Sequence, residues 1–356
     1  MDLIDHEVPA TRAARPFTMD GHQDALFYAQ AYGGTAVFDA GGPTAQLDLP
    51  GLRAGEVDAA LWAVFGHAEQ QEPYDPATAI AETDTLLDGY RAWVAGNPAY
   101  RLLYDAADVQ ELAQRHAATT AGDPTELSEA GPYHASEPEP FGVLLHCEGA
   151  RGIAGVTHLE ALHARGLRSV GLTWNGANAY ATGAHGDPAT PLTAAGKELV
   201  GALNRLHMMV DGAHLNRQGL WDLLETSTAP IAVTHTGCAA LHADPRNLQD
   251  DQIRAVAAAG GVIGVFMVNM FLAPTGSAVT LDTLLAHYDH LLELVGPDHV
   301  TLGSDYGGVS SGLPAGLERS ANLPRLYAAF AARGYSAETI AAIRGGNYLR
   351  LLSAVL

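Results

Sequence analysis

Lysine and cysteine are scarce in this 356-residue chain. Lys197 is the only lysine, and 19 basic residues against 40 acidic ones give a formal net charge of −21. A surface this acidic repels nucleic acid and anionic lipid, so we expect neither a nucleic-acid partner nor a membrane partner. Cys147 and Cys238 are too few for a disulfide framework, which favours a reduced, cytoplasmic protein.

Long apolar runs are missing as well. No stretch reaches the roughly 20 residues that cross a bilayer, and residues 1–16 lack the basic start and apolar run of a secretory signal peptide. The chain is 47% hydrophobic and 17% charged, enough for a large buried core. We interpret residues 1–16 as an N-terminal arm and residues 17–356 as a single domain, with an acidic, proline-rich insertion at residues 121–140.

Short apolar runs alternate with segments of helical spacing along this domain. The segments between the runs include residues 55–70, 157–166, 193–206 and 281–296, and further helical segments follow the last run. Eightfold strand–helix alternation predicts an α/β protein with a (β/α)8 TIM-type barrel. A doubly wound sheet is the alternative, but no G-x-G-x-x-G loop follows the first strand. The predicted strands are residues 17–24, 35–42, 141–149, 168–176, 208–214, 231–237, 261–268 and 299–308.

Imidazole and carboxylate side chains follow five of the predicted strands. Alone, each one is also explained by a solvated turn or a hydrogen-bonded core histidine. Five together, at the strand ends where barrel enzymes carry their chemistry, indicate a metal site. His146 should lie one layer deeper in the barrel, because it comes two residues before a candidate ligand. The candidate ligands are His22, Asp24, Glu148, His214, His235 and Asp305.

The charges of these candidates favour two metal ions. Three buried carboxylates need compensating cations. Two divalent ions supply four positive charges, which three carboxylates and one hydroxide balance. Glu148 is the candidate bridge between ions about 3.5–4 Å apart. The mixed ligand set favours zinc, although manganese, cobalt or iron suits it too. Lys197 lies in a helical segment, which excludes it as a bridging carbamylated lysine.

Several motifs, in this order, resemble those of the membrane (renal) dipeptidase family of the amidohydrolase superfamily. The resemblance runs from about Thr18 to the C-terminus and includes "DGHQD", "CEGA", "GLTWN", "VTHTG" and "GSDYGG". It implies that His22 and Asp24 bind one zinc ion and that Glu148 bridges to the second. It also implies that His214 and His235 bind the second ion.

The resemblance also assigns roles outside the ligand set. Asp305 matches an acid that contacts the metal-bound water and shuttles its proton, and Arg246 matches an arginine that binds the substrate carboxylate. A surface pair with a neighbouring aspartate is the alternative for Arg246. Trp174 stands where many family members carry a histidine that polarises the scissile carbonyl. Trp174 itself, the second metal or His185 is the candidate replacement.

The function implied by the resemblance is that of a binuclear metallopeptidase. It hydrolyses dipeptides, including those with a C-terminal D-residue, by attack of a hydroxide that bridges the two metals, with Glu148 and Asp305 as catalytic residues. An amidohydrolase acting on N-acyl amino acids, lactams or lactones is the first alternative. A non-catalytic peptide-binding homologue is the second. The resemblance further implies a homodimer.

Overall fold

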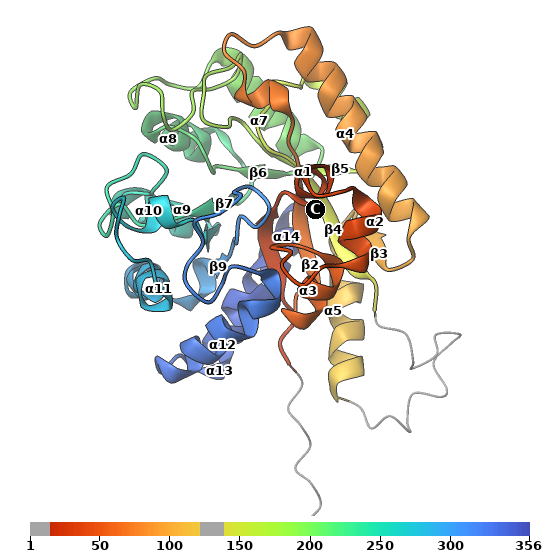
Figure 1. The fold of residues 1–356 in the computed structure, drawn as a ribbon. Coiled ribbons are helices and arrows are strands. Elements are labelled where there is room, and N and C mark those ends of the chain that lie inside the picture. The colour runs from red at the N-terminus through yellow and green to blue at the C-terminus, as the bar shows by residue number, and fades with distance from the viewer. Residues whose placement is uncertain (1–14, 122–138) are drawn as a thin grey trace, which may run out of the picture.

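The computed structural model describes residues 15–121 and 139–356 of the chain (Figure 1). The predicted N-terminal arm, except for its last two residues, and the predicted insertion, except for its ends, therefore lie outside the described residues. Within the described ranges no helix is both long and apolar enough to cross a membrane.

Eight parallel strands form a nearly closed barrel, as predicted. They follow the order β1-β2-β4-β5-β6-β7-β8-β9, and β3 pairs with β4 off this path. Backbone hydrogen bonds from Asp24 to Tyr306 (3.0 Å) and from Asp305 to His22 (3.1 Å) connect the first strand to the segment after the last. The strands are β1 Met19–Gln23, β2 Ala59–Val64, β3 Tyr100–Leu102, β4 Phe141–Cys147, β5 Leu167–Gly171, β6 Met209–Asp211, β7 Ala232–Thr236, β8 Val262–Val265 and β9 Val300–Leu302.

Helices surround the strands and connect each to the next (Figure 1). Short turns of helix lie at η1 His67–Gln70, η2 Pro297–His299, η3 Ser320–Asn322 and η4 Ala342–Gly346. The α-helices are α1 Ala25–Ala31, α2 Thr35–Ala40, α3 Leu49–Ala54, α4 Pro76–Gly96, α5 Ala106–Ala121, α6 Val156–Ala164, α7 Ala194–Arg205, α8 Arg217–Thr226, α9 Asp250–Ala258, α10 Asn269–Leu272, α11 Leu281–Val295, α12 Leu323–Ala332, α13 Ala337–Ala341 and α14 Asn347–Val355.

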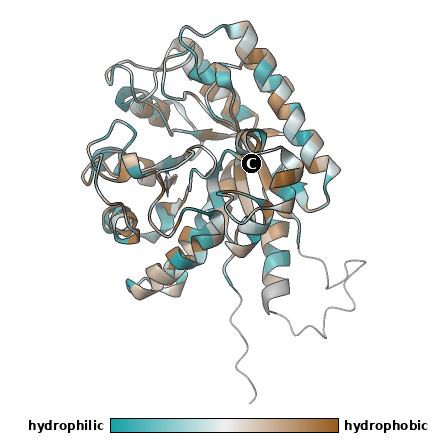
Figure 2. Ribbon diagram, in the orientation of Figure 1, coloured by the Kyte–Doolittle hydropathy of each residue, from teal (hydrophilic) through white to brown (hydrophobic). Residues whose placement is uncertain are grey.

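Burial on both faces explains the composition of the strands. Every residue of β1, β2, β4 and β7 is buried, as expected of parallel strands that helices cover. Figure 2 shows hydrophobic residues along the strands and a mixture of both kinds on the outer helices. Between barrel and helices, the Trp62 ring stacks on Trp93 at a centroid distance of 4.8 Å and meets Phe38 edge-on at 5.9 Å.

The second predicted strand was wrong. Residues 35–42 contain helix α2, whereas the second strand, β2, lies within residues 55–70, which were predicted to be helical. All six residues of β2 are buried, so their apolar run is continuous and has no alternation that distinguishes a strand from a helix. In α2 only Phe38 is buried, and Val37 is 49% exposed. The other seven predicted strands each overlap a strand of the barrel.

Candidate active site

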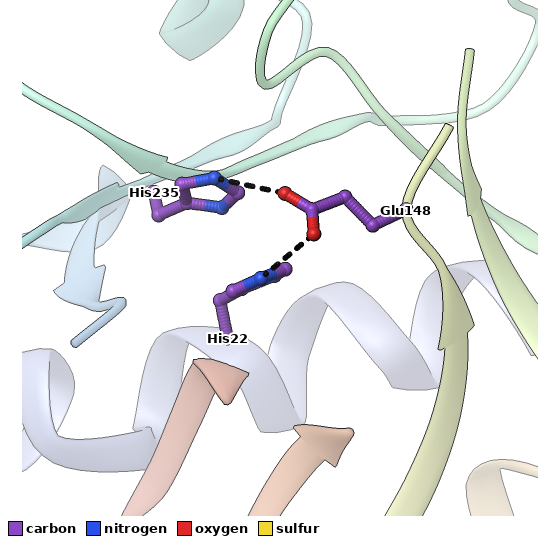
Figure 3. Close-up of side chains that lie close together, drawn as sticks. All are labelled: His22, Glu148 and His235. Atoms are coloured by element: carbon purple, nitrogen blue, oxygen red, sulfur yellow. Dashed lines mark ion pairs between the residues drawn. The ribbon is translucent and has the colours of Figure 1, made fainter. Parts of the chain in front are cut away.

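The structure brings the predicted ligands together at the C-terminal ends of the strands. His22 Nε2 lies 3.4 Å from Asp24 Oδ2 and 3.5 Å from Glu148 Oε2. The other oxygen of Glu148 lies 3.0 Å from His214 Nε2 and 3.6 Å from His235 Nε2. Figure 3 shows the carboxylate of Glu148 between the rings of His22 and His235, one oxygen directed at each. The two oxygens of Glu148 therefore face different imidazoles.

Two overlapping groups of side chains have the spacing of metal ligands. Within each group the ligand atoms lie within 4.8 Å of one another. His22 belongs to both groups, so the two positions adjoin. Asp305 reaches the second group from the segment after β9. The groups are His22, Glu148 and His235, and His22, Asp24 and Asp305.

Two of the predicted ligands, His214 and Asp305, have a left-handed backbone conformation. The φ angle is 66° at His214 and 63° at Asp305, and only two other non-glycine residues in the described ranges share positive φ. Such conformations cost about 1–3 kcal/mol each and persist where the surrounding structure holds them. Both residues follow the ends of barrel strands, in the same layer as the other ligands.

Hydrogen bonds determine which nitrogen of two histidines carries the proton. His214 Nδ1 lies 3.0 Å from Asn175 Oδ1, an oxygen that only accepts. His235 Nδ1 lies 2.9 Å from Thr234 Oγ1, which donates its own proton to Asp211 at 2.6 Å and so must accept from the ring. Burial lowers the pKa of His214 to about 3 and the pKa of His235 well below its usual range, so both rings are neutral. Both therefore carry their proton on Nδ1.

The opposite nitrogens of these rings then expose lone pairs to one another. His214 Nε2 and His235 Nε2 are 2.9 Å apart, and both face the Glu148 carboxylate. Three electron-rich atoms at such distances repel unless a cation lies among them. Neutral imidazole and carboxylate are ligands of zinc and related divalent ions. The residues present thus fit a metal ion.

His22 gives independent support for a cation at this point. Its side chain is fully buried, and neither ring nitrogen has a hydrogen-bond partner in the described part of the chain. Burial opposes a positive charge on His22, but the carboxylates of Glu148 and Asp24 outweigh it and raise its pKa well above the usual value. Burial likewise opposes the charge of Glu148, and the imidazoles of His22 and His214 outweigh it and lower its pKa.

Arg246 lies beside the cluster and is not a surface residue. Its side chain is 3% exposed, Nη2 lies 3.5 Å from the His235 carbonyl oxygen, and Nε has no partner among the described residues. Asp244 accepts the backbone N–H of Arg246 at 2.9 Å. Burial lowers the pKa of Arg246 against the opposing charges of Asp305 and Glu148. The predicted alternative, a surface pair, does not describe this residue.

A cavity of about 280 Å³ adjoins the cluster, and its lining includes His214, Arg246 and His185. His185 lines the cavity but is exposed to solvent. Trp174 is half-buried, with its ring centroid 6.3 Å from that of His214 and 5.5 Å from that of Phe65. Trp174 therefore packs beside a candidate ligand.

Deeper in the barrel, polar residues support the cluster. The prediction that His146 lies one layer below is confirmed: its Nδ1 lies 2.9 Å from Ser169 Oγ and its Nε2 3.5 Å from Asp211 Oδ2. Burial lowers the pKa of His146 to about 4. Sequence reasoning missed Asn175, Thr234 and Asp211. Their only signal was position, since Asn175 follows Trp174 and Thr234 precedes His235.

A parallel barrel with histidines and carboxylates at its C-terminal rim defines a metallohydrolase of the amidohydrolase type. The family model of the membrane dipeptidases (peptidase family M19) matches residues 126–356. The chain belongs to this family, as the sequence motifs predicted.

Individual relatives agree with this assignment. An uncharacterized protein in the pqqA 5′ region of Klebsiella pneumoniae is 39% identical over 239 residues, which cover 64% of this chain and 88% of the relative. A metallopeptidase from Rhodobacter sphaeroides, solved with a phosphinate mimic of the dipeptide L-Ala-D-Ala, is 26% identical with a TM-score of 0.81 over 96% of this chain and 100% of that one. A family M19 metallopeptidase, dipeptidase AC, is 27% identical with a TM-score of 0.81, covering 96% and 99%.

Proposed function

We propose that this protein is a dipeptidase whose centre holds two divalent ions, with zinc as the favoured metal. The observation that carries the proposal is the convergence of two imidazole lone pairs on Glu148, beside two further carboxylates. His22 and Asp24 would hold one ion and His214 and His235 the other. Glu148, with one oxygen directed at each side, would bridge them. When bound, the ions supply Lewis acidity and lower the pKa of water, so that it attacks a peptide carbonyl at neutral pH.

Asp305 is the proposed proton carrier. Burial, together with the charges of Asp24 and Glu148, raises its pKa to about 8 against the opposing charge of His22. This pKa belongs to the metal-free cluster, so the proposed role rests on the place of Asp305 beside His22 and Asp24, where a carboxylate can accept and donate a proton. Asp305 takes the proton of the attacking water and delivers it to the leaving amine.

Arg246 is the proposed binding group for the substrate carboxylate. Its unpartnered Nε and its place in the lining of the cavity support this role, because a guanidinium fork matches a carboxylate with two parallel hydrogen bonds. A cavity of about 280 Å³ is suited to a small substrate. The relative from Rhodobacter sphaeroides was solved with an L-Ala-D-Ala mimic, which supports dipeptides with a C-terminal D-residue as substrates.

The test is hydrolysis of a mixed library of L,L and L,D dipeptides by the zinc-loaded protein, compared with N-acyl amino acids, lactams and lactones. Metal-dependent release of free amino acids from dipeptides is expected. If only the acylated or cyclic substrates were turned over, the proposed dipeptidase activity would be wrong and the alternative amidohydrolase activity would take its place. Trp174, at a position where the family resemblance leads us to expect histidine, is the observation that favours this alternative. Well under one metal ion per chain, with peptide binding but no turnover, would indicate a peptide-binding homologue.

We also propose a cytoplasmic homodimer. The two free, buried cysteines support a reducing compartment. Cell fractionation and analytical ultracentrifugation test the two parts separately. Recovery of the protein outside the cytoplasm, or a sedimenting monomer at micromolar concentration, would contradict them.

A further inference from the structure

The segment that follows β5 contacts a candidate metal ligand from outside the cluster. Asn175 Oδ1 lies 3.0 Å from His214 Nδ1, the ring nitrogen that faces away from Glu148. The neighbouring Trp174 ring lies at 33° to the imidazole. Asn175 and His214 are 39 residues apart in the chain, so the contact depends on the fold and not on local sequence.

The backbone holds Asn175 in this position. Gly183 donates to the Gly176 carbonyl at 3.1 Å, and Ala184 donates to the His214 carbonyl at 2.7 Å, so residues 182–184 join the two loops. A Cβ atom at Gly183 would overlap the carbonyl oxygens of Trp174 and Asn175. This close approach requires glycine and leaves little freedom to the Asn175 backbone.

We propose that Asn175 is a positioning residue that keeps the proton of His214 on Nδ1 and so directs the Nε2 lone pair at the metal centre. An amide oxygen accepts and cannot donate, so it is compatible with only this tautomer. Outer partners of this kind orient metal-binding histidines and raise their basicity. The inference rests on the proposed function, because it assumes that His214 binds a metal ion. It gives the segment that carries Trp174 and Asn175 a role that acts through this ligand.

The other two histidines show why Asn175 can be tested separately. His235 depends on Thr234 and Asp211, which are 0% and 1% exposed, and Asp211 also accepts the backbone N–H groups of Thr234 and Ala213. His22 has no hydrogen-bond partner for its ring nitrogens in the described ranges. Asn175 is only partly buried and its side chain contacts His214 from a loop, so replacing it disturbs one ligand without opening the core.

The experiment compares Asn175→Leu, which removes the acceptor, with Asn175→Asp, which keeps it. Asn204→Leu is the matched control, since Asn204 bonds Ser227 and Thr228 at the end of α7, and neither is a site residue. Zinc affinities of the metal-free proteins are measured by competition with a chromophoric chelator, and the cobalt-loaded proteins give absorption spectra of the ligand field. Melting of the metal-free proteins reports the fold.

In Asn175→Leu, one of the two zinc-binding steps should weaken by about 10- to 100-fold, and the cobalt spectrum should change. Asn175→Asp and Asn204→Leu should keep both affinities. Unchanged affinities and spectrum in Asn175→Leu would overturn the inference while leaving the dipeptidase proposal intact. If the parent protein binds no metal, the proposed function fails first. Should Asn175→Leu not fold, Asn175→Ala removes the same acceptor, and the same two outcomes decide.

Discussion

Replacing Arg246 with glutamine tests how the cavity recognises a substrate. Arg246 is 3% exposed, its Nε is unpartnered among the described residues, and it lines the cavity together with His214. If Arg246 binds the terminal carboxylate, the loss should be confined to substrates that have one. The comparison therefore needs a dipeptide and its C-terminal amide, which differ only in that group.

The size of the effect follows from the number of hydrogen bonds. A bidentate guanidinium forms two charge-assisted bonds, each contributing about 1.5–3 kcal/mol. The lower limit for the pair, about 3 kcal/mol, corresponds to a preference of roughly 150-fold in kcat/KM for the free carboxylate. In Arg246→Gln this preference should fall below about tenfold, because glutamine offers at most one uncharged hydrogen bond. The loss should appear mainly in KM, since the carboxylate is bound equally in the ground state and the transition state.

The assay measures kcat and KM for both substrates with the parent, with Arg246→Gln and with Arg91→Gln. Arg91 is the matched control because its exposed side chain pairs with nearby Asp88 at 3.3 Å and with no other acidic residue of the described ranges. Metal content is determined for each protein, so that loss of the ions is not mistaken for loss of recognition. If Arg246→Gln kept the 150-fold preference with its metal intact, the carboxylate would be bound elsewhere and the assignment of Arg246 would be wrong.

Three further predictions concern the cluster itself. Since burial beside Asp24 and Glu148 raises the pKa of Asp305 to about 8, this carboxyl is protonated at pH 7 in the metal-free protein and must lose its proton when metal binds. Zinc affinity should therefore rise between pH 6 and 8, by about tenfold per pH unit for each proton displaced, as titration at several pH values will show. Asp305→Asn should retain metal but lower kcat by about 100-fold or more. In Gly303→Ala the new Cβ would overlap the Thr234 carbonyl oxygen, which should destabilise the protein by about 1–3 kcal/mol in denaturant unfolding and weaken zinc binding.

For each of these three predictions, one result would contradict it. A zinc affinity that is flat or falls with rising pH would mean that Asp305 is not protonated beside the empty cluster. Full turnover by Asp305→Asn would remove Asp305 from the reaction. A Gly303→Ala protein as stable as the parent would show that the strands adjust to a side chain at this position.

The barrel, and the gathering of the candidate ligands at one end of it, could be predicted from the sequence because both depend on local features. Strands buried on both faces are short apolar runs, and ligands such as His22 and His235 stand at the end of such runs. The burial of both faces also explains why β2 was predicted to be helical. Its unbroken apolar run does not alternate, so it cannot be distinguished from a buried helical segment by periodicity. Asn175 could not be found this way, since its contact with His214 joins two loops 39 residues apart. Polar partners of ligands have no periodicity and are recognised only in the folded chain.

The central claim is that six residues from five strand ends hold two metal ions. Diffraction from zinc-loaded crystals, recorded above and below the zinc absorption edge, tests it most directly. Two anomalous peaks about 3.5–4 Å apart are predicted, on either side of the Glu148 carboxylate, with His22 and Asp24 at one and His214 and His235 at the other. Absence of anomalous density at this cluster in a zinc-loaded, folded protein would contradict the account.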